Sequence, residues 1–411
     1  GVTEVTGFLE GEDAISTMNA FRAMGVRIDG PHQGRVAVYG VGMRGLRAPL
    51  APIDCGNSGT SMRLLSGLLA GQDFACELIG DSSLMKRPMR RVAEPLARMG
   101  ADIATNADGR PPVRIRPAKA LRGIEYDMPV ASAQVKSSLL LAGLYAQGRT
   151  CVREPAPTRD HSERMLRAFG YRVDVNGNQI CLQGGGELRA APIQVPADIS
   201  SAAFFMIGAS IATDSDILLT DVGINPTRTG VIDILRAMGA DLTLSNQREL
   251  GGEPVADIRV RSAKLRGIAI PQELVPLAID EFPAIFIAAA NAQGATVLSG
   301  AEELRVKESD RIQVMADGLR VLGVDATPTP DGMRIVGKGG GHAATAMAAA
   351  TSSYTGGEID SHGDHRIAMA FAMAALMASG AITIRDCANV ATSFPGFVEL
   401  AVRAGLSIKA A

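Results

Sequence analysis

The alternation of hydrophobic and polar positions defines a structural unit between residues 294 and 326. Residues 295–299 form a short β-prone run, and residues 301–305 form a polar connection. Hydrophobic residues then recur at helical spacing up to a glycine, which commonly follows the last turn of a helix. These residues are Ile312, Met315, Ala316, Leu319, Leu322 and Gly323. The pattern predicts a strand, a connection and an amphipathic helix with a charged first turn.

The same unit recurs along the chain, and each copy ends in a glycine. The six closing glycines are Gly25, Gly100, Gly170, Gly239, Gly323 and Gly405. The intervals between them are 75, 70, 69, 84 and 82 residues. This period is far longer than that of most solenoid repeats. Six copies can close as one ring or as two groups of three.

Two groups of three fit the usual size of a domain better. The third copy ends near residue 193, where Pro192 and Pro196 favour a hinge. We therefore predict two α/β domains of three units each, residues 1–194 and 195–411, with buried helices inside and a cleft between the domains.

A second helical pattern precedes five of the six strands. These segments are small or hydrophobic on nearly every side, which predicts buried helices. Each begins with Asn, Ser or Asp, which are good N-cap residues. The segments are residues 56–72, 131–148, 198–214, 280–294 and 363–380. The first strand, residues 2–5, has none before it, so the repeat predicts that one buried helix with its polar first turn is missing from the front.

Composition favours an ordinary globular protein of 411 residues, with 46% hydrophobic and 20% charged residues. The net charge of −2 shows no nucleic-acid or membrane footprint, so any anion site must be local. Five cysteines without a CxxC pair predict a reduced, cytoplasmic protein without a metal site. Residues 367–384 are long and hydrophobic enough to suggest a membrane span. Gly380 interrupts them, however, and the sister copies predict helix, turn and strand.

Cationic side chains stand at the start of the amphipathic helix in four copies. They are Lys86, Arg87, Arg159, Arg228, Lys307 and Arg311. Cations in a first helical turn oppose the helix dipole and cost about 0.3–1 kcal/mol each when exposed. Their repetition indicates that they bind anions. The alternative is local ion pairing with Asp81, Asp160 or Glu308.

The starts of the buried helices carry further candidates. Residues 56–60, Gly-Asn-Ser-Gly-Thr, would expose backbone N–H groups to an anion, unless the glycines serve only a tight turn. Ser132 and Gln134 are suited to polar substrate groups, with capping as the alternative for Ser132. Arg366 either binds an anion or forms an ion pair with Asp364.

Asp280 and Glu308 are carboxylates among cations and are therefore candidates for acid and base catalysis. The alternative for Asp280 is an N-cap. Taken together, the residues predict a two-domain α/β protein with a cationic cleft for a small substrate that carries several phosphate or carboxylate groups.

Six motifs, in this order along the whole chain, make the sequence similar to a known family. They are Gly56-Asn57-Ser58-Gly59-Thr60-Ser61-Met62-Arg63, Met85-Lys86-Arg87-Pro88, Ser132-Ala133-Gln134, Thr158-Arg159-Asp160-His161, Arg305-Val306-Lys307-Glu308-Ser309-Asp310-Arg311 and Asp364-His365-Arg366. The sequence resembles the enolpyruvyl transferases, in particular the members that act on shikimate 3-phosphate. The resemblance implies two inside-out α/β domains, each of three βαβαββ repeats, that close on the substrate.

The resemblance also implies a reaction in the shikimate pathway, which leads to chorismate and the aromatic amino acids. The carboxyvinyl group of phosphoenolpyruvate would be transferred to the 5-hydroxyl of shikimate 3-phosphate, with release of phosphate. It implies no cofactor and no metal. We expect a monomer without a nucleic-acid or membrane partner.

Residue roles follow from the same resemblance, position by position. Phosphoenolpyruvate would be bound by Asn57, Gly59, Arg87, Gln134, Arg311 and Arg366. Shikimate 3-phosphate would be bound by Ser132, Ala133, Gln134, Arg159, Asp280 and Lys307, with Ala133 acting through its backbone. Asp280 would accept the 5-hydroxyl proton, Glu308 would deliver a proton to the methylene carbon, and Lys307 would lie between the two ligands.

The sequence departs from the family pattern at a few positions. The N-terminal Lys-Ser-x-x-x-Arg motif, which belongs in the missing first helix, is absent, and Thr392 stands where many members have Lys. Members with Ala at the position of Gly59 tolerate the inhibitor glyphosate, so Gly59 suggests a glyphosate-sensitive pocket.

Three alternative functions remain at this point. The UDP-N-acetylglucosamine enolpyruvyl transferases share the implied fold but usually carry a reactive Cys in the loop that here spans residues 80–86. That loop has no Cys, and Cys76 lies in the preceding strand. A second alternative is an inactive fragment that needs an N-terminal segment supplied in trans. The third, an RNA-modifying enzyme such as the RNA 3′-phosphate cyclases, is disfavoured by the near-neutral charge.

Overall fold

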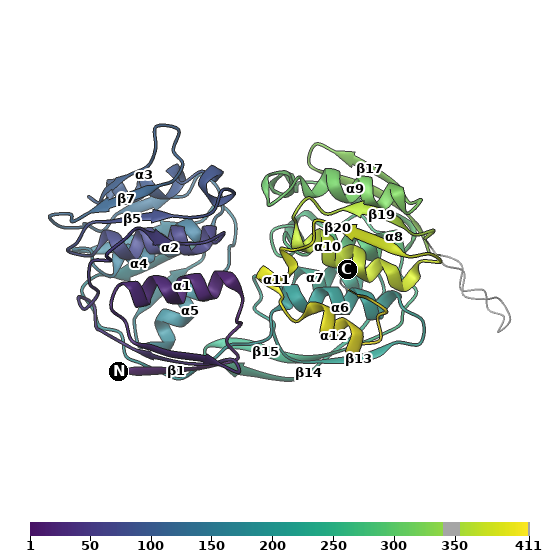
Figure 1. The fold of residues 1–411 in the computed structure, drawn as a ribbon, viewed down its shortest axis with the longest axis horizontal. Coiled ribbons are helices and arrows are strands. Elements are labelled where there is room, and N and C mark those ends of the chain that lie inside the picture. Colours follow the sequence, from purple (N-terminus) through teal and green to yellow (C-terminus); the bar gives the residue numbers. More distant parts are fainter. Residues whose placement is uncertain (340–353, 410–411) are drawn as a thin grey trace. The chain divides into compact units, whose positions relative to one another are not determined.

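The computed structural model describes residues 1–339 and 354–409, and the chain divides into two compact units. Unit 1 comprises Gly1–Val195 together with Leu250–Glu253, and unit 2 comprises Pro196–Glu249 and the chain from Pro254 onward. Figure 1 labels the elements along the chain. Apart from the tip of one β-hairpin, the chain therefore completes unit 1 before it begins unit 2.

Unit 1 repeats a motif of strand, helix and β-hairpin. Its helices are α1 (Glu12–Ala23), α2 (Gly59–Ala70), α3 (Arg90–Arg98), α4 (Ala133–Gly143) and α5 (His161–Ala168), with the 3-10 helix η1 (Leu84–Lys86). Its strands are β1 (Val2–Thr6), β2 (Ile28–His32), β3 (Arg35–Tyr39), β4 (Ile53–Asp54), β5 (Cys76–Ile79), β6 (Asp102–Ala104), β7 (Val113–Arg116), β8 (Glu125–Asp127), β9 (Arg149–Arg153), β10 (Val173–Asn176), β11 (Gln179–Gln183) and β12 (Ile193–Gln194).

The strand order shows how each copy is built. Two sheets have the orders β4-β5-β7-β6 and β8-β9-β11-β10, in which the first pair is parallel and the other pairs are antiparallel. A buried helix connects each parallel pair, because parallel strands need a crossover. The third sheet has the order β12-β1-β3-β2, so its parallel edge strand comes from the end of the unit.

Unit 2 follows the same plan. Its helices are α6 (Ile199–Ile211), α7 (Gly230–Ala237), α8 (Phe282–Ala290), α9 (Arg311–Val321), α10 (His365–Ala374), α11 (Val390–Ser393) and α12 (Phe397–Arg403), with the 3-10 helices η2 (Gln272–Leu274), η3 (Glu302–Val306) and η4 (Ala375–Met377). Its strands are β13 (Asp216–Gly223), β14 (Asp241–Leu250), β15 (Glu253–Arg261), β16 (Gln293–Leu298), β17 (Asp325–Thr329), β18 (Gly332–Lys338), β19 (Gly357–Asp360) and β20 (Ile382–Arg385).

The sheets of unit 2 also combine parallel and antiparallel pairs. Their orders are β13-β15-β14, β16-β18-β17 and the parallel pair β19-β20. Isolated parallel bridges, Ala197 with Val222 and Ala269 with Val297, add the strand contact that precedes α6 and α8. The predicted fold class, α/β with repeated βαβαββ units, is confirmed.

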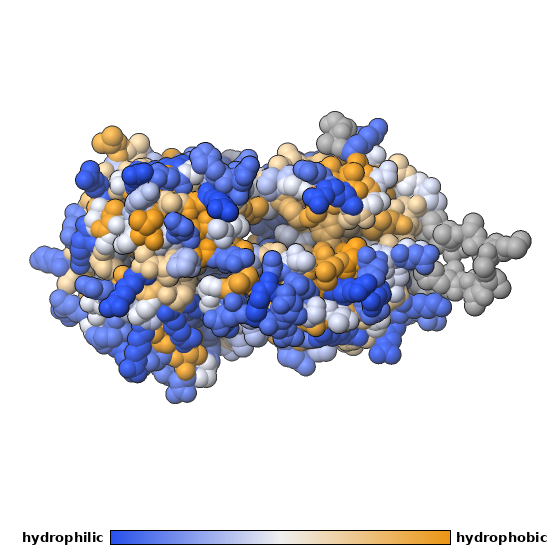
Figure 2. All heavy atoms as spheres, turned by 90° about the horizontal axis from the view of Figure 1, so that it is seen from below, coloured by the Kyte–Doolittle hydropathy of each residue, from blue (hydrophilic) through white to orange (hydrophobic). Residues whose placement is uncertain are grey.

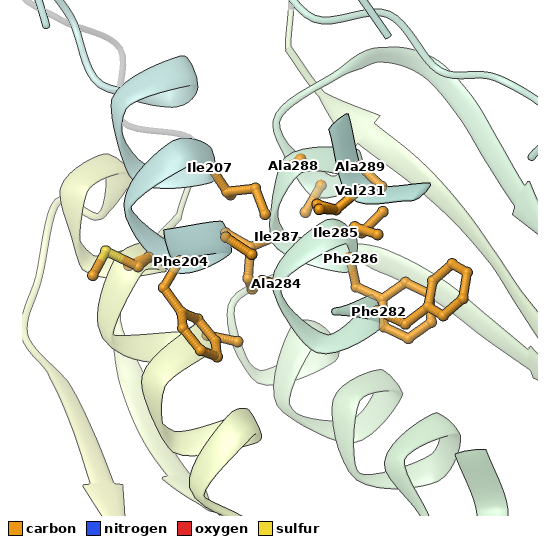
Figure 3. Close-up of a cluster of buried hydrophobic side chains, with 14 of the residues drawn as sticks. Phe204, Ile207, Val231, Phe282, Ala284, Ile285, Phe286, Ile287, Ala288 and Ala289 are labelled. Carbon is orange, nitrogen blue, oxygen red and sulfur yellow. The ribbon is translucent and has the colours of Figure 1, made fainter. Parts of the chain in front are cut away.

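The buried helices form the centre of each unit, as their hydrophobic pattern predicts. In unit 1, α2 packs on α4, and in unit 2, α6, α8 and α10 pack on one another. All nine residues of α8 are buried. Figure 3 shows Phe204 and Ile207 of α6 beside Ala284 and Ile287 of α8. Burying a side chain as large as Phe or Ile stabilises the fold by about 1.5–3 kcal/mol.

The hydrophobic stretch at 367–384 has the structure expected from its sister copies. It contains most of α10, the turn η4 and the start of β20. Within residues 1–339 and 354–409, no helix is both long and hydrophobic enough to cross a membrane. On the face shown in Figure 2, hydrophilic residues are spread widely, with hydrophobic residues gathered in patches between them.

The expectation of five reduced cysteines is wrong. Cys151 and Cys181 form a disulfide with an S–S distance of 2.12 Å. They are directly opposite each other in the antiparallel pair of β9 and β11, which brings their Cα atoms to 4.2 Å. Sequence separation alone could not reveal this register. Cys55, Cys76 and Cys387 are free.

Gly67 is required where α2 and α4 pack against each other. A Cβ at this position would lie 2.0 Å from the carbonyl oxygen of Ser138. We expect Gly67→Ala to lower the free energy of unfolding by about 2 kcal/mol, because the two helices must move apart. Urea denaturation measures this change. Gly396→Ala is the control, since a Cβ there meets nothing within 4 Å. Equal stabilities of the two variants would contradict the prediction.

Candidate active site

The unit 1 cluster consists of Asn57, Gly59, Arg63, Arg87 and Gln134, at and around the N-termini of α2 and α4. Arg87 Nη2 donates to Asn57 Oδ1 at 2.9 Å, and Arg63 Nη1 donates to Gln134 Oε1 at 2.5 Å. Two guanidinium groups thus lie at the start of a helix, where the helix dipole is also positive. The cluster is suited to binding an anion.

Gly59 allows both guanidinium groups to approach the first turn of α2. A Cβ at this position would lie 3.1 Å from Arg63 Nη1 and 3.3 Å from Arg87 Nη1. Burial, together with the neighbouring Arg91 and Arg87, lowers the pKa of Arg63 to about 10. Arg63 therefore stays charged at neutral pH, at an electrostatic cost that a bound anion would reduce.

Asp81, the local ion-pair partner considered for this segment, is engaged elsewhere. Its carboxylate accepts hydrogen bonds from Asn57 Nδ2 at 2.6 Å and from the backbone N–H of Leu84 at 2.7 Å. Asn57 in turn accepts from Arg87. The acidic side chain thus orients the asparagine that holds the arginine.

The predicted shikimate 3-phosphate ligands of unit 1 lie at the starts of α4 and α5. Ser132 is the N-cap of α4, as the capping alternative predicted, and accepts from the backbone N–H of Val135. Ala133 is the first residue of α4, and the half-buried Arg159 lies between β9 and α5. A hydrogen bond of 2.7 Å between the hydroxyls of Ser137 and Ser162 fixes α5 against α4.

The unit 2 cluster consists of Asp280, Lys307, Glu308, Arg311 and Asp364. Arg311 is at its centre, with only 1% of its side chain exposed. Its guanidinium contacts Asp364 Oδ2 at 2.8 Å, Glu308 Oε2 at 2.6 Å and Asp280 Oδ1 at 3.5 Å. Lys307 Nζ also lies 3.5 Å from Asp280 Oδ1. Three helix starts, those of α8, α9 and α10, therefore meet at one buried cation.

The pKa values of this cluster reflect competition between burial and charge. Burial opposes ionisation of Glu308 and Asp364, but Arg311 outweighs it and holds the pKa of each carboxyl below its usual range. Burial, followed by Arg366, lowers the pKa of His365 to about 4, so this imidazole is neutral at pH 7. Arg311 Nη1 is buried without a hydrogen-bond partner. This N–H group is a donor available to a ligand that displaces a neighbouring carboxylate.

Two of the alternatives considered for this region do not hold. The N-cap of α8 is Glu281, so Asp280 does not cap the helix and its carboxylate faces the cations instead. The Asp364 carboxylate accepts a hydrogen bond from the backbone N–H of Arg366, but its ion pair is with the Arg311 side chain. The guanidinium of Arg366 donates to the carbonyl oxygen of Asp280 at 3.0 Å and lies 3.9 Å from Glu281 Oε1.

Arg228, the cation of the fourth repeat, binds the starts of two buried helices. Its Nη2 lies 3.1 Å from Asp198 Oδ1, the N-cap of α6, and donates to Ser200 Oγ at 2.5 Å. It is also 4.0 Å from Glu281 Oε1. Arg228 therefore forms ion pairs, but with acids at the starts of α6 and α8 and not with the local acids Asp81, Asp160 or Glu308.

Three residues were absent from the predicted site list although they contact its members. Arg63 contacts Gln134, Asp364 contacts Arg311, and Glu281 contacts Arg366. Arg63 and Asp364 stood within the quoted motifs, so only their roles were missed. For Glu281 the sequence offered less, since it shows only a second acid, next to Asp280, at the start of a hydrophobic helix.

Comparison with known proteins adds an independent finding. Residues 1–400 match the family described as EPSP synthase (3-phosphoshikimate 1-carboxyvinyltransferase). A protein from Alkalilimnicola ehrlichii named 3-phosphoshikimate 1-carboxyvinyltransferase is 65% identical over 408 residues, covering 99% of this chain and 89% of the relative. One from Nitrosococcus oceani with the same name is 64% identical over 409 residues, covering 100% and 89%.

A solved structure agrees with these relatives. The EPSP synthase from Acinetobacter baumannii superposes with a TM-score of 0.91 at 61% identity, covering 100% of this chain and 91% of that one. The repeated α/β fold and the cationic helix starts are therefore those of an enolpyruvyl transferase. More particularly, the chain belongs to the EPSP synthase family.

The nucleotide-sugar alternative finds no support in these matches. Cys76 is in β5, not in the loop that follows, and burial raises its pKa to about 11. At neutral pH this thiol is protonated and therefore a poor nucleophile.

Asp364 provides a test of the buried ion pairs. Asp364→Asn keeps the shape and the capping oxygen but removes the most deeply buried counterion of Arg311, which is 0% exposed and 2.8 Å from it. We expect the free energy of unfolding to fall by about 3 kcal/mol, because a buried cation loses a partner. Chemical denaturation measures the loss. Asp325→Asn, whose carboxylate is 67% exposed and 4.0 Å from Arg334, should cost far less. Similar losses in both variants would refute the argument.

Proposed function

We propose that the protein transfers the enolpyruvyl group of phosphoenolpyruvate to the 5-hydroxyl of shikimate 3-phosphate and releases phosphate. Membership of the EPSP synthase family supports this reaction. The observation that carries it is the unit 2 cluster, in which Asp280 and Glu308 both contact the buried Arg311. Such an arrangement supplies two carboxylates in different environments, as a reaction with separate acid and base steps requires.

The division into two units corresponds to two enolpyruvyl transferase domains in this proposal. Unit 1 ends at Val195, close to the boundary at residue 194 proposed from the repeats. We also propose that the enzyme acts as a monomer. Light scattering of the purified protein tests this, and a larger mass would contradict it.

Phosphoenolpyruvate, in this proposal, is bound by cations and amides from both clusters. The residues are Asn57, Gly59, Arg87, Gln134, Arg311 and Arg366. Arginine suits this role because its planar group can bind carboxylate or phosphate through two N–H groups. Arg311 contacts three carboxylates in the described structure, so the substrate would compete with Glu308 or Asp280 for it.

Shikimate 3-phosphate would be bound by residues at three helix starts. They are Ser132, Ala133, Gln134, Arg159, Asp280 and Lys307. The first two stand at the N-terminus of α4, where backbone N–H groups and the helix dipole favour an anion. Lys307 and Asp280 are 3.5 Å apart, so a hydroxyl near the lysine would also be near the carboxylate.

The two carboxylates divide the proton transfers. Asp280 accepts the proton of the 5-hydroxyl while the hydroxyl oxygen attacks C2 of phosphoenolpyruvate. Glu308 donates a proton to the C3 methylene. Loss of a proton from the resulting methyl group and departure of phosphate then restore the double bond. Glu308 is ionised in the described structure, since Arg311 lowers its pKa. An anionic substrate that drew Arg311 away would raise this pKa and favour the acid form.

Phosphate release provides the test of the reaction. The full chain with phosphoenolpyruvate and shikimate 3-phosphate should release phosphate continuously. UDP-N-acetylglucosamine in place of shikimate 3-phosphate should give none. The proposed function would be overturned if phosphate were released with UDP-N-acetylglucosamine but not with shikimate 3-phosphate, or with neither acceptor.

Glu308 is the residue whose loss should affect the chemical step most directly. We expect Glu308→Gln to lower kcat by about 10²–10⁴-fold, since the amide cannot donate a carboxyl proton. Steady-state kinetics measure kcat. Asp317→Asn, in the helix α9 that follows Glu308, is the control; this side chain is 58% exposed, and the variant should retain normal kcat. A Glu308→Gln variant with normal kcat would remove Glu308 from the acid role.

The absence of a side chain at Gly59 should leave room for phosphoenolpyruvate and for its competitor glyphosate to bind. A methyl group in Gly59→Ala would press on Arg63 and Arg87, at 3.1 and 3.3 Å. We expect the unsubstituted enzyme to be inhibited by micromolar-range glyphosate, and the variant to have a raised KM for phosphoenolpyruvate and weaker inhibition. Initial rates measured over a range of phosphoenolpyruvate and glyphosate concentrations give the KM and the strength of inhibition. An insensitive unsubstituted enzyme would contradict this expectation.

A further inference from the structure

Glu281 is a buried carboxylate that the proposed mechanism does not use. It follows Asp280 directly, forms the N-cap of α8 and is 3% exposed. Its side chain accepts a hydrogen bond from the hydroxyl of Ser200. An ionised carboxylate in this position is costly unless cations compensate it.

Two arginines provide this compensation from different helices. Glu281 Oε1 is 3.9 Å from Arg366 Nη1 and 4.0 Å from Arg228 Nη2. Burial raises the pKa of Glu281, and Arg366 is the strongest influence that lowers it again. Both arginines therefore compensate the carboxylate, from nearly equal distances.

The orientation of Arg366 depends on residues 280 and 281 together. Its Nη1 donates to the backbone oxygen of Asp280 at 3.0 Å, and the Glu281 carboxylate faces the same nitrogen. The side chain remains 17% exposed, so part of the guanidinium can still meet a ligand. Glu281 thus lies on one side of the group, while another side remains accessible.

Glu281 is itself held in place by Ser200 and Arg228. Arg228 binds Asp198 at 3.1 Å and donates to Ser200, and Ser200 donates to Glu281. Contacts therefore run without a break from the N-cap of α6 to the first turn of α10. This network engages Arg228, the repeated cation to which the family resemblance gives no role.

We propose that Glu281 is a positioning residue that holds the Arg366 guanidinium ready for phosphoenolpyruvate, with Arg228 and Ser200 fixing Glu281 in turn. The inference rests on the proposed function and extends it, because Glu281 is not among the ligands proposed for either substrate. Without the carboxylate charge, Arg366 would keep its bond to the Asp280 carbonyl but lose its ionic partner. Its guanidinium would then sample other orientations, and phosphoenolpyruvate would bind more weakly.

Glu281→Gln tests this role, since glutamine keeps the size and a hydrogen-bond acceptor but removes the charge. We expect KM for phosphoenolpyruvate to rise about tenfold, a change of about 1.4 kcal/mol, while KM for shikimate 3-phosphate stays within about twofold. Initial rates measured against each substrate separate the two constants. A role in folding alone would not single out one substrate.

Glu163→Gln is the matched control in unit 1. Glu163 is also a buried carboxylate, 2% exposed, and is paired with Lys136 at 2.7 Å. This variant should lose stability but keep the KM for phosphoenolpyruvate. If both variants raise that KM equally, or if Glu281→Gln raises both KM values together, the positioning role is overturned.

A double-variant cycle tests whether the effect passes through Arg366. In an Arg366→Lys background, Glu281→Gln should change the KM for phosphoenolpyruvate much less than it does alone, since the group it positions is gone. Additive effects would overturn the inference.

Ser200→Ala covers the case in which Glu281→Gln does not fold. It removes only the hydroxyl that donates to Glu281, and we expect a smaller rise in the same KM; no rise would overturn the inference. Failure of the proposed function is a separate result, because the unsubstituted protein would then release no phosphate. Normal turnover with unchanged constants in Glu281→Gln would reject only the positioning role.

Discussion

The charge of Arg311 is the constraint around which unit 2 is organised. A guanidinium that is 1% exposed must be compensated, and the carboxylates that do so come from the starts of α8, α9 and α10. Removing one partner costs more than forming the pair gains, because the remaining charge stays buried. The same contacts bring both proposed acid and base groups to one cation. Stability and chemistry therefore depend on the same ion pairs.

The internal repeat explains why charges gather at helix starts. In three copies the start of a buried helix contacts a cation at the start of an amphipathic helix, through Asn57 and Arg87, Asp198 and Arg228, and Asp364 and Arg311. Caps such as Ser58 and Asp198 satisfy part of each N-terminus, and the remaining N–H groups favour anions. Cations placed there would oppose the helix dipole without a partner. In unit 2 the partners are carboxylates, whereas the unit 1 cluster has two guanidiniums held by the amides of Asn57 and Gln134.

The repeat has diverged in what its cations do. Arg311 is the first residue of α9 and Arg228 lies just before α7. Each reaches the acid at the N-cap position of the next buried helix, Asp364 and Glu281 respectively. Arg311 is assigned to a substrate in our proposal, whereas Arg228 is assigned to support. In our proposal, the same kind of contact between a cation and an acid at a helix start therefore serves binding in one copy and positioning in another.

The sequence by itself determined the strands, the buried and amphipathic helices and the family, because these depend on local periodicity and on motifs contiguous in the chain. It also brought out Asp280, Glu308 and Arg366 as candidates. Only the tertiary structure decided which groups pair. Glu281 rather than Asp280 occupies the N-cap position of α8, Arg311 rather than Arg366 forms the ion pair with Asp364, and strand register joins Cys151 to Cys181. Pairing depends on distances between segments remote in sequence, and a helix start offers several neighbouring acids with similar capping ability. Local pattern identifies the charged groups, but only packing selects their partners.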